Sequence, residues 1–358
     1  MFEPPRDAGD DVLEVGPRRH WPRWVPAVAA FAVAGAVMAL LVGRDGGQHR
    51  AAPRPTDSAR GQPVTRSIGG AANEALAVSG HYLYRFFSGA LYRSDITDPL
   101  DPVPAGVTSV GGFDLTLQGV EFGLVLDPAH RQLFVISLNA APATIVRIDL
   151  DTMAEAGRLV WPTAVAAAAV LDGHLFLAAT NSVVDIPPGG TDSRPIPALL
   201  GQYSDLSADL ARHRLVLFGR EGKAMRVVTY RPADGRSTRA AAPFAKGWLA
   251  VAGDAIWAGG YANSGAVLAR LDPSTLKPVA FSALTPQLGP GAIPVASGGR
   301  DVWVRSGSGG DGLWCVDGRT GDSLQYWQYE GAVASEVGAA YVATSSGPLP
   351  LRLGSCAG

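Results

Sequence analysis

The chain has 358 residues, of which 47% are hydrophobic and 17% charged, and it contains 44 glycines and 27 prolines. Low charge combined with many turn-forming residues is typical of an all-β domain and argues against a mainly helical or disordered protein. The net charge is −2 and no nucleic-acid-binding motif occurs, so we expect no DNA or RNA partner.

The first feature along the chain is an apolar segment near the N-terminus. Residues 24–43 (WVPAVAAFAVAGAVMALLVG) carry no charge. A helix of this length extends for about 30 Å, which matches the hydrocarbon core of a bilayer. We therefore predict a transmembrane helix over residues 21–43. Three arginines lie just before or within its first turn, at Arg18, Arg19 and Arg23. The positive-inside rule then predicts a cytoplasmic N-terminus and a C-terminal domain outside the cell.

The segments on either side of this helix are predicted to be disordered. Residues 1–20 are polar and would form a short cytoplasmic tail, and residues 44–65 combine Gly, Pro, Arg and Ser as a flexible linker does. A cleaved signal peptide is the main alternative. It fits less well, because the apolar run exceeds the usual length of about 7–15 residues and no small-x-small cleavage site precedes Arg44. A buried core helix fits less well still, because nothing nearby would cover it.

From residue 66 onward the chain repeats one pattern of short apolar strands and turns. Seven apolar segments recur at spacings of 38 to 51 residues: HYLYRFF (81–87), RQLFVIS (131–137), GHLFLAA (173–179), HRLVLFG (213–219), DAIWAGG (254–260), RDVWVRS (300–306) and AAYVATS (339–345). A period near 40 residues built from short strands is typical of a β-propeller with one four-stranded blade per repeat. We predict a seven-bladed β-propeller over residues 66–358.

Each repeated segment is predicted to be the second strand of its blade. A first strand rich in small residues precedes it, and a third strand follows and ends at Asp, Pro or Gly. The second strands are continuous apolar runs, which indicates that both of their faces are covered. An open β-sandwich is the alternative fold. The last repeat stops after its third strand, so we expect residues 63–69 (PVTRSIG) to supply the missing outer strand and close the ring.

Three third-strand corners carry a resemblance to a known superfamily. The segments RPADGRS (231–237), LDPSTLKP (271–278) and VDGRTGDSL (316–324) resemble the corners of quinoprotein-like and YVTN-type propellers. The segment 316–327 is most similar to the Trp-docking motif of pyrroloquinoline-quinone repeats, with Asp317, Thr320 and Gly321 in place and Gln325 at the position of the docking Trp. The resemblance covers residues 70–358 and implies a propeller fold. Pyrroloquinoline quinone or Ca²⁺ would belong only to an enzyme of this type, and we predict no cofactor.

The two cysteines, Cys315 and Cys356, fall in neighbouring repeats near the end of the chain. An exported domain permits a disulfide, and we predict that they form one. Closing a loop of 41 residues would stabilise the domain by about 4 kcal/mol on the chain-entropy model. Two free thiols, or a metal or catalytic pair, are the alternatives.

The candidate binding residues lie near the starts of first strands or in loops between repeats, where a propeller has its axial opening. They are Glu74, Glu121, Trp161, Tyr203, Asp205, Lys246, Trp248 and Glu330. The histidines His81, His130, His174 and His213 all stand at turns before second strands, and no metal site is predicted from them.

These features favour a single-pass membrane protein that displays a propeller outside the cell. We expect it to act as a binding or assembly module for an extracytoplasmic protein or a small polar ligand. No nucleophile–base pair, phosphate loop or dinucleotide fingerprint occurs. An exported enzyme of quinoprotein-like or hydrolase type, using the axial pocket, is the alternative function. A sensor with a cytoplasmic partner is a third.

Overall fold

The computed structural model describes only part of the chain. The described residues are 66–68, 74–116, 120–252, 255–262, 265–283, 292–297, 301–306, 312–317, 320, 322–327, 333–336, 339–344 and 347–352. The chain divides into two units, residues 1–56 and 57–358, and every described residue belongs to the second. The predicted tail (1–20), transmembrane helix (21–43) and linker (44–65) lie outside the described residues. Within the described part, no helix has the length and apolarity needed to cross a membrane.

The described residues form seven antiparallel sheets, which we number 1 to 7 along the chain. Their first strands are β2 (Glu74–Ser79), β6 (Glu121–Asp127), β10 (Val165–Leu171), β14 (Gln202–Asp209), β18 (Lys246–Ala252), β22 (Ala292–Ser297) and β26 (Val333–Glu336). Their second strands are β3 (Tyr82–Phe87), β7 (Gln132–Leu138), β11 (His174–Ala179), β15 (Arg214–Glu221), β19 (Ala255–Ala262), β23 (Asp301–Ser306) and β27 (Ala339–Thr344). Each predicted second strand is therefore confirmed as a strand at its predicted position.

The third and fourth strands complete the sheets. The third strands are β4 (Ala90–Asp95), β8 (Ala143–Asp149), β12 (Ser182–Ile186), β16 (Ala224–Arg231), β20 (Gly265–Leu271), β24 (Leu313–Asp317) and β28 (Gly347–Arg352). The fourth strands are β5 (Val103–Ser109), β9 (Glu155–Trp161), β13 (Arg194–Leu200), β17 (Arg236–Ala241), β21 (Pro278–Ala283) and β25 (Ser323–Trp327). A short 3₁₀ helix, η3 (Leu210–Arg212), joins β14 to β15. Sheet 2 also includes β1 (Arg66–Ile68).

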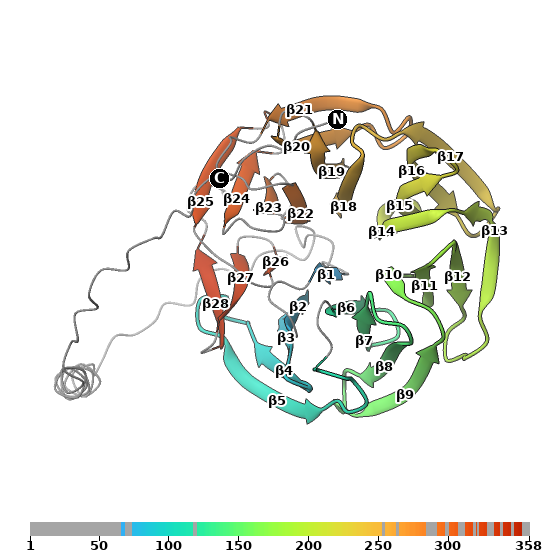
Figure 1. The fold of residues 1–358 in the computed structure, drawn as a ribbon. Helices are drawn as coiled ribbons and strands as arrows, with labels where there is room; N and C mark the ends of the chain where they lie inside the picture. The colour runs from blue at the N-terminus through green and yellow to red at the C-terminus, as the bar shows by residue number, and fades with distance from the viewer. Residues whose placement is uncertain are drawn as a thin grey trace, which may run out of the picture. The chain divides into compact units, whose positions relative to one another are not determined.

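The sheets are arranged as the blades of a β-propeller. The first strands contact one another in the cyclic order β2, β6, β10, β14, β18, β22 and β26, and β26 contacts β2 again. Figure 1 shows these strands innermost, with fourth strands such as β5, β9 and β13 on the outside. The repeat pattern of the sequence predicted this arrangement, and we refer to the sheets below as blades 1 to 7.

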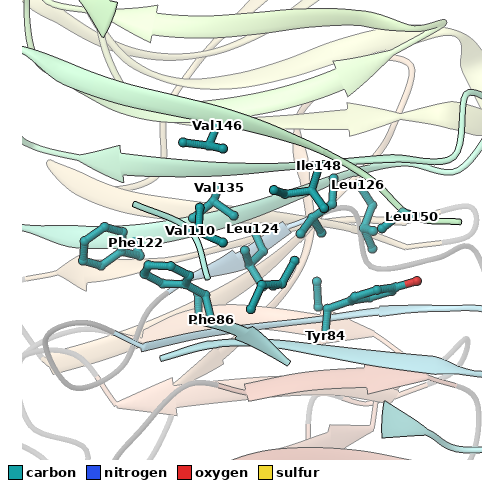
Figure 2. Close-up of a cluster of buried hydrophobic side chains, with 14 of the residues drawn as sticks. Tyr84, Phe86, Val110, Phe122, Leu124, Leu126, Val135, Val146, Ile148 and Leu150 are labelled. Carbon is teal, nitrogen blue, oxygen red and sulfur yellow. The ribbon is translucent and has the colours of Figure 1, made fainter. Parts of the chain in front are cut away.

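Burial follows the position of a strand within its blade. Every residue of β7 after Gln132 is buried, as its continuous apolar sequence predicted. The first strand β10 is also almost entirely buried, and its alanines (VAAAAVL) leave room where strands converge. The fourth strands β9 and β17 are mostly exposed along their length. The core is therefore a series of layers between blades, and Figure 2 shows the layer between blades 1 and 2, where Phe86 and Phe122 lie close together.

The predicted Asp–Thr corners are present at the ends of third strands. Asp272 Oδ1 accepts hydrogen bonds from the amide and hydroxyl of Thr275, at 2.7 and 2.9 Å. Asp317 Oδ1 accepts one from the amide of Thr320 at 2.9 Å. The same corner occurs in blade 2, where Asp149 Oδ1 bonds the amide and hydroxyl of Thr152 at 2.8 Å each. Sequence analysis did not single out this third copy.

The predicted closure of the ring by residues 63–69 is wrong for the described part of that segment. β1 pairs antiparallel with β6, with Arg66 opposite Val125 and Ile68 opposite Gly123. It also contacts β2 and β26, so it lies at the inner edge of blade 2 near the axis (Figure 1). Among the described strands, blade 7 has only three, β26, β27 and β28.

The sequence of β28 (GPLPLR) explains why its outer edge is a poor place for a fourth strand. Amide N–H groups of alternate residues in an antiparallel strand point toward the same edge. Pro348 and Pro350 have no N–H and cannot donate to β27. The residues that alternate with them in β28 therefore supply the N–H donors to β27. The outer edge of β28 therefore offers carbonyl groups at 348 and 350 but no donors there.

Packing of apolar side chains closes the ring instead. Leu76, Val78 and Leu83 of blade 1 form one buried cluster with Ala334 and Tyr341 of blade 7. Tyr341 lies in β27 and its side chain is fully buried. In the described structure, contacts between blades 1 and 7 thus close the ring, and residues 66–68 do not supply an outer strand to blade 7.

Replacing Tyr341 with Ala should open a cavity at this junction. We expect the free energy of unfolding to fall by about 3 kcal/mol, because large-to-small substitutions of buried aromatic residues cost about 3–5 kcal/mol. Urea denaturation of both proteins measures the difference. Tyr92→Ala in β4 is the matched control, since Tyr92 is 41% exposed and its loss should cost less than about 1 kcal/mol. Equal losses in the two variants would contradict closure through this cluster.

Burial of Tyr84 in the layer between blades 1 and 2 gives a pH-dependent stability. Desolvation raises the pKa of the Tyr84 phenol from its usual 10 to about 12. Above pH 10 the unfolded chain loses this proton while the folded chain keeps it, so stability falls as the pH rises. Between pH 9 and 11, the unfolding free energy of Tyr84→Phe should decline less than that of the wild type. Identical slopes in urea titrations at these pH values would show that Tyr84 does not contribute.

Candidate ligand-binding cleft

Three of the predicted site residues stand at the starts of first strands, as expected. Glu74 is the first residue of β2, Glu121 the first of β6 and Lys246 the first of β18. Asp205 lies further along its strand, three residues into β14. It therefore does not stand at the start of its first strand as Lys246 does. Glu330 lies outside the described residues.

Glu74 is buried and forms an ion pair within its own blade. The Nε and Nη2 atoms of Arg85, on the neighbouring strand β3, lie 2.7 Å from Glu74 Oε1. The guanidinium group of Arg85 also lies over the ring of Phe87, at 4.7 Å from its centroid. The negative charge of Glu74 is thus balanced inside the blade rather than presented to a ligand.

Asp205 is a structural link between blades 4 and 5. Its side chain is fully buried, and Oδ2 accepts a hydrogen bond from the amide of Leu249 in β18 at 2.6 Å. Oδ1 accepts another from the amide of Leu206 at 2.7 Å. A bulge in the pairing of β14 with β15 lies between Tyr203 and Asp205. The carboxylate therefore supports the packing of two blades and does not line an open surface.

The two aromatic residues predicted to lie in loops both belong to strands. Tyr203 is the second residue of β14, is 2% exposed, and donates a hydrogen bond to Glu221 Oε1 at 2.6 Å. Burial, and after it this hydrogen bond, raises the pKa of the Tyr203 phenol. Trp161 is the last residue of β9, and its Nε1 donates to Thr163 Oγ1 at 3.0 Å. Trp161 packs against the apolar layer between blades 2 and 3.

A cleft lies at the starts of β14 and β18 and extends to blade 3. Its volume is about 1070 Å³, which includes the solvent at its opening. Its walls come from four consecutive blades: Asn139, Ala164, Ala166, Ala179, Thr180, Gln202, Tyr203, Ser204, Arg220, Met225, Ala245 and Lys246. Four of these residues are alanines, whose small side chains leave the space open. Tyr203 and Lys246 are the members of the predicted set that the structure brings to this cleft.

Gly219 allows the wall of the cleft at Tyr203 to form. It pairs with Tyr203 across β14 and β15. A Cβ atom at Gly219 would lie 2.4 Å from the carbonyl oxygen of Gln202 and 2.5 Å from Cα of Tyr203. Any other residue here would push the two strands apart, so the shape of the cleft depends on this glycine.

The charges that line the cleft are positive. Arg220 donates a hydrogen bond to the side-chain oxygen of Gln202, and Lys246 Nζ lies 5.5 Å from the ring centroid of Trp248. No carboxylate is among the residues that line the cleft. Both cations therefore keep their charge available, with a polarisable indole ring next to one of them. This arrangement suits a polar ligand with an anionic group.

Sequence analysis missed Arg220, Gln202 and Met225, although they line the same cleft. Arg220 lies at the end of a second strand, and Met225 at the start of a third. Both residues stand at ends of second and third strands, outside the first-strand starts and loops where a propeller ligand site was expected. The bulge in β14 that brings Gln202 beside Arg220 has no distinct signal in the sequence.

No group of three His, Cys, Asp or Glu side chains that could hold a metal ion comes together in the described ranges. Three of the histidines that precede second strands instead pair with single aspartates: His130 with Asp127 at 2.9 Å, His174 with Asp185 at 2.7 Å and His213 with Asp172 at 3.0 Å. The last pair joins blades 3 and 4, which indicates a structural role.

Comparison with known proteins supports the fold. No family model and no curated protein matches the chain. A chain of a mitotic checkpoint complex aligns with a TM-score of 0.58 at 10% identity, over 87% of this chain and 99% of that one. The computationally designed Ika8 protein aligns with a TM-score of 0.53 at 13% identity, over 80% and 98%. A chain of the nidogen–laminin complex aligns at 0.51 and 10%, over 75% and 97%. These similarities to β-propeller proteins show that the chain has a β-propeller fold.

Proposed function

We propose that this chain is a binding module that holds a polar ligand with an anionic group in the cleft at the starts of β14 and β18. The observation that carries the proposal is the pair of cations, Arg220 and Lys246, on walls that contain no carboxylate. Lys246 Nζ lies over the ring of Trp248, 5.5 Å from its centroid, and this cation–π contact helps to position the ammonium group. The strands hold Arg220 and Lys246 in place for binding. The proposed function involves no covalent step.

The proposal includes the membrane anchor at residues 21–43. Support for the anchor comes from the sequence, since residues 24–43 are uncharged and long enough to span a bilayer. The arginines on the N-terminal side favour an orientation with the propeller outside the cell. The ligand would then be an extracytoplasmic molecule or a group on the surface of another protein.

A disulfide between Cys315 and Cys356 belongs to the same proposal. Cys315 is fully buried in β24 and is not a free thiol in the structure. The chain contains only these two cysteines. A bridge would tie the end of the chain to blade 6 beside the three-stranded blade 7, where no outer strand is described. An oxidising compartment is required for such a bond to persist.

Thiol labelling of the full chain tests export and the disulfide together. Cells that express the protein are quenched with acid, and the denatured chain is treated with a polyethylene-glycol maleimide before or after reduction. We expect no mass shift before reduction and a shift for both cysteines after it. Cys356→Ser should label once without reductant and should unfold at lower urea concentration. Two labels on the unreduced wild type would contradict both the bridge and the exported location.

The ligand class is tested with glucuronate and glucose 6-phosphate as anionic probes, and with glucose as their neutral match. We expect the anionic probes to raise the melting temperature of the full chain at millimolar concentration, because a ligand that binds only the folded state stabilises it. Lys246→Gln and Arg220→Gln should each weaken binding about tenfold, the equivalent of about 1.4 kcal/mol. Lys223→Gln, in the exposed turn before β16, is the control. Equal effects of glucose, or equal affinities in all variants, would contradict an anion site in this cleft.

A further inference from the structure

A second groove lies between blades 2 and 3, and none of its lining residues belongs to the cleft described above. Its volume is about 380 Å³, again including solvent at the opening. Apolar side chains form both walls, with Phe134, Ile145 and Leu159 from blade 2 and Leu175 and Ile186 from blade 3. Arg147, on the third strand of blade 2, lies among them.

The guanidinium group of Arg147 uses little of its hydrogen-bonding capacity within the protein. Its Nη2 donates to the carbonyl oxygen of Ala156 at 3.0 Å. Its Nε is buried and has no hydrogen-bond partner. None of the ion pairs found in the described residues includes Arg147. A cation half-buried between apolar walls without a carboxylate is costly unless a ligand supplies the opposite charge.

Arg93, at the same position in blade 1, makes more contacts than Arg147, although its Nε is likewise buried without a hydrogen-bond partner. Arg93 pairs with Tyr84 across β3 and β4, just as Arg147 pairs with Phe134 across β7 and β8. Yet Arg93 donates from Nη1 to the carbonyl oxygen of Leu150 at 2.8 Å, and from Nη2 to that of Ala105 at 3.3 Å. Its guanidinium group also lies 4.9 Å from the ring centroid of Tyr82.

The difference between these two arginines comes from the corner of the following blade. The corner of blade 2 brings Leu150 and Met153, both buried, against Arg93, and Met153 lies 3.9 Å from the position of a Cβ on Gly106. The corner of blade 3 has Pro188, Gly189, Gly190 and Thr191 in the corresponding place, and the last three line the groove. The small corner residues of blade 3 thus leave a space open beside Arg147. The larger corner residues of blade 2 fill the corresponding space beside Arg93.

The other charges at the groove cancel each other. Arg158 lines one side, and its Nη2 and Nε bind Glu155 at 2.7 and 3.0 Å. Its Nη1 donates to the carbonyl oxygen of Gly111 at 2.7 Å. The net charge that a ligand meets is therefore the single positive charge of Arg147. One cation between aliphatic walls complements one carboxylate flanked by aliphatic groups.

We propose that this groove binds an extended peptide segment of a partner protein, with a glutamate or aspartate carboxylate on Arg147. Aliphatic side chains on either side of the acidic residue would pack against Leu159, which is partly exposed, while Phe134 and Leu175 are buried beneath the groove. The planar guanidinium group matches a carboxylate geometrically, and the interaction is stronger away from water. This interaction surface is separate from the anion site at β14 and β18 and does not rest on it.

The probe is an acetylated and amidated peptide of sequence Ala-Leu-Glu-Leu-Ala, titrated into the full chain labelled with ¹⁵N-arginine. We expect a saturable shift of the Arg147 Nε–H resonance, identified by its loss in Arg147→Gln, while the Arg93 resonance stays in place. The peptide with Gln in place of Glu should bind at least tenfold more weakly. A phosphoserine peptide that binds better than the glutamate peptide would overturn the choice of a carboxylate.

Two variants and one matched control separate a binding role from a structural one. Arg147→Gln should weaken binding of the peptide at least tenfold. Thr191→Met should do so as well, because it refills the groove as Met153 does in blade 2 while leaving the charge in place. Arg93→Gln is the control and should bind normally. Melting curves establish which variants fold. If Arg147→Gln does not fold, the peptide affinity of Thr191→Met tests the proposal. Wild-type affinity in a folded Thr191→Met protein, or an equal loss in Arg93→Gln, would overturn the proposal.

Discussion

The whole propeller depends on the burial of each sheet between its two neighbours. A four-stranded sheet with apolar residues on both faces has no stable existence in water by itself, because each face needs a cover. The cluster around Phe86 and Phe122 covers one face of blade 1 and one of blade 2 (Figure 2). Polar links such as Asp205 to the amide of Leu249 then fix how far apart two blades stand. The cluster around Tyr341 covers part of blade 1 and part of blade 7 in the same way and closes the cycle.

Sites arise in this fold where neighbouring blades fail to fill the space between them. Beside Tyr203 the small residues Ala164, Ala166 and Ala179 leave a cleft near the axis. Between blades 2 and 3 the glycines of the blade 3 corner leave a groove on Arg147. In both places the specific chemistry comes from a few side chains that the repeat does not require. A propeller can therefore keep its packing and change its ligand by changing corner and strand-end residues.

The repeat period and the apolar second strands predicted the blades well, because blade packing imposes the same pattern on every repeat. The Asp–Thr corners could also be predicted, because a short local motif forms them. The site was harder to predict. Glu74 and Asp205 stand near the expected end of their strands, but Arg85 and a backbone amide bind them. Arg220 came to the cleft through a bulge in β14, which depends on pairing between strands and not on local sequence.

The placement of residues 63–69 failed for a reason that matters beyond ring closure. The outer side of β28 has prolines at 348 and 350, so a strand from a second molecule would find carbonyl acceptors but no amide donors at these two positions. Exposed sheet edges are the usual starting points for polymerisation, and prolines weaken the pairing that an incoming strand could make. The prolines of β28 thus act against the recruitment of further copies of the chain along this edge.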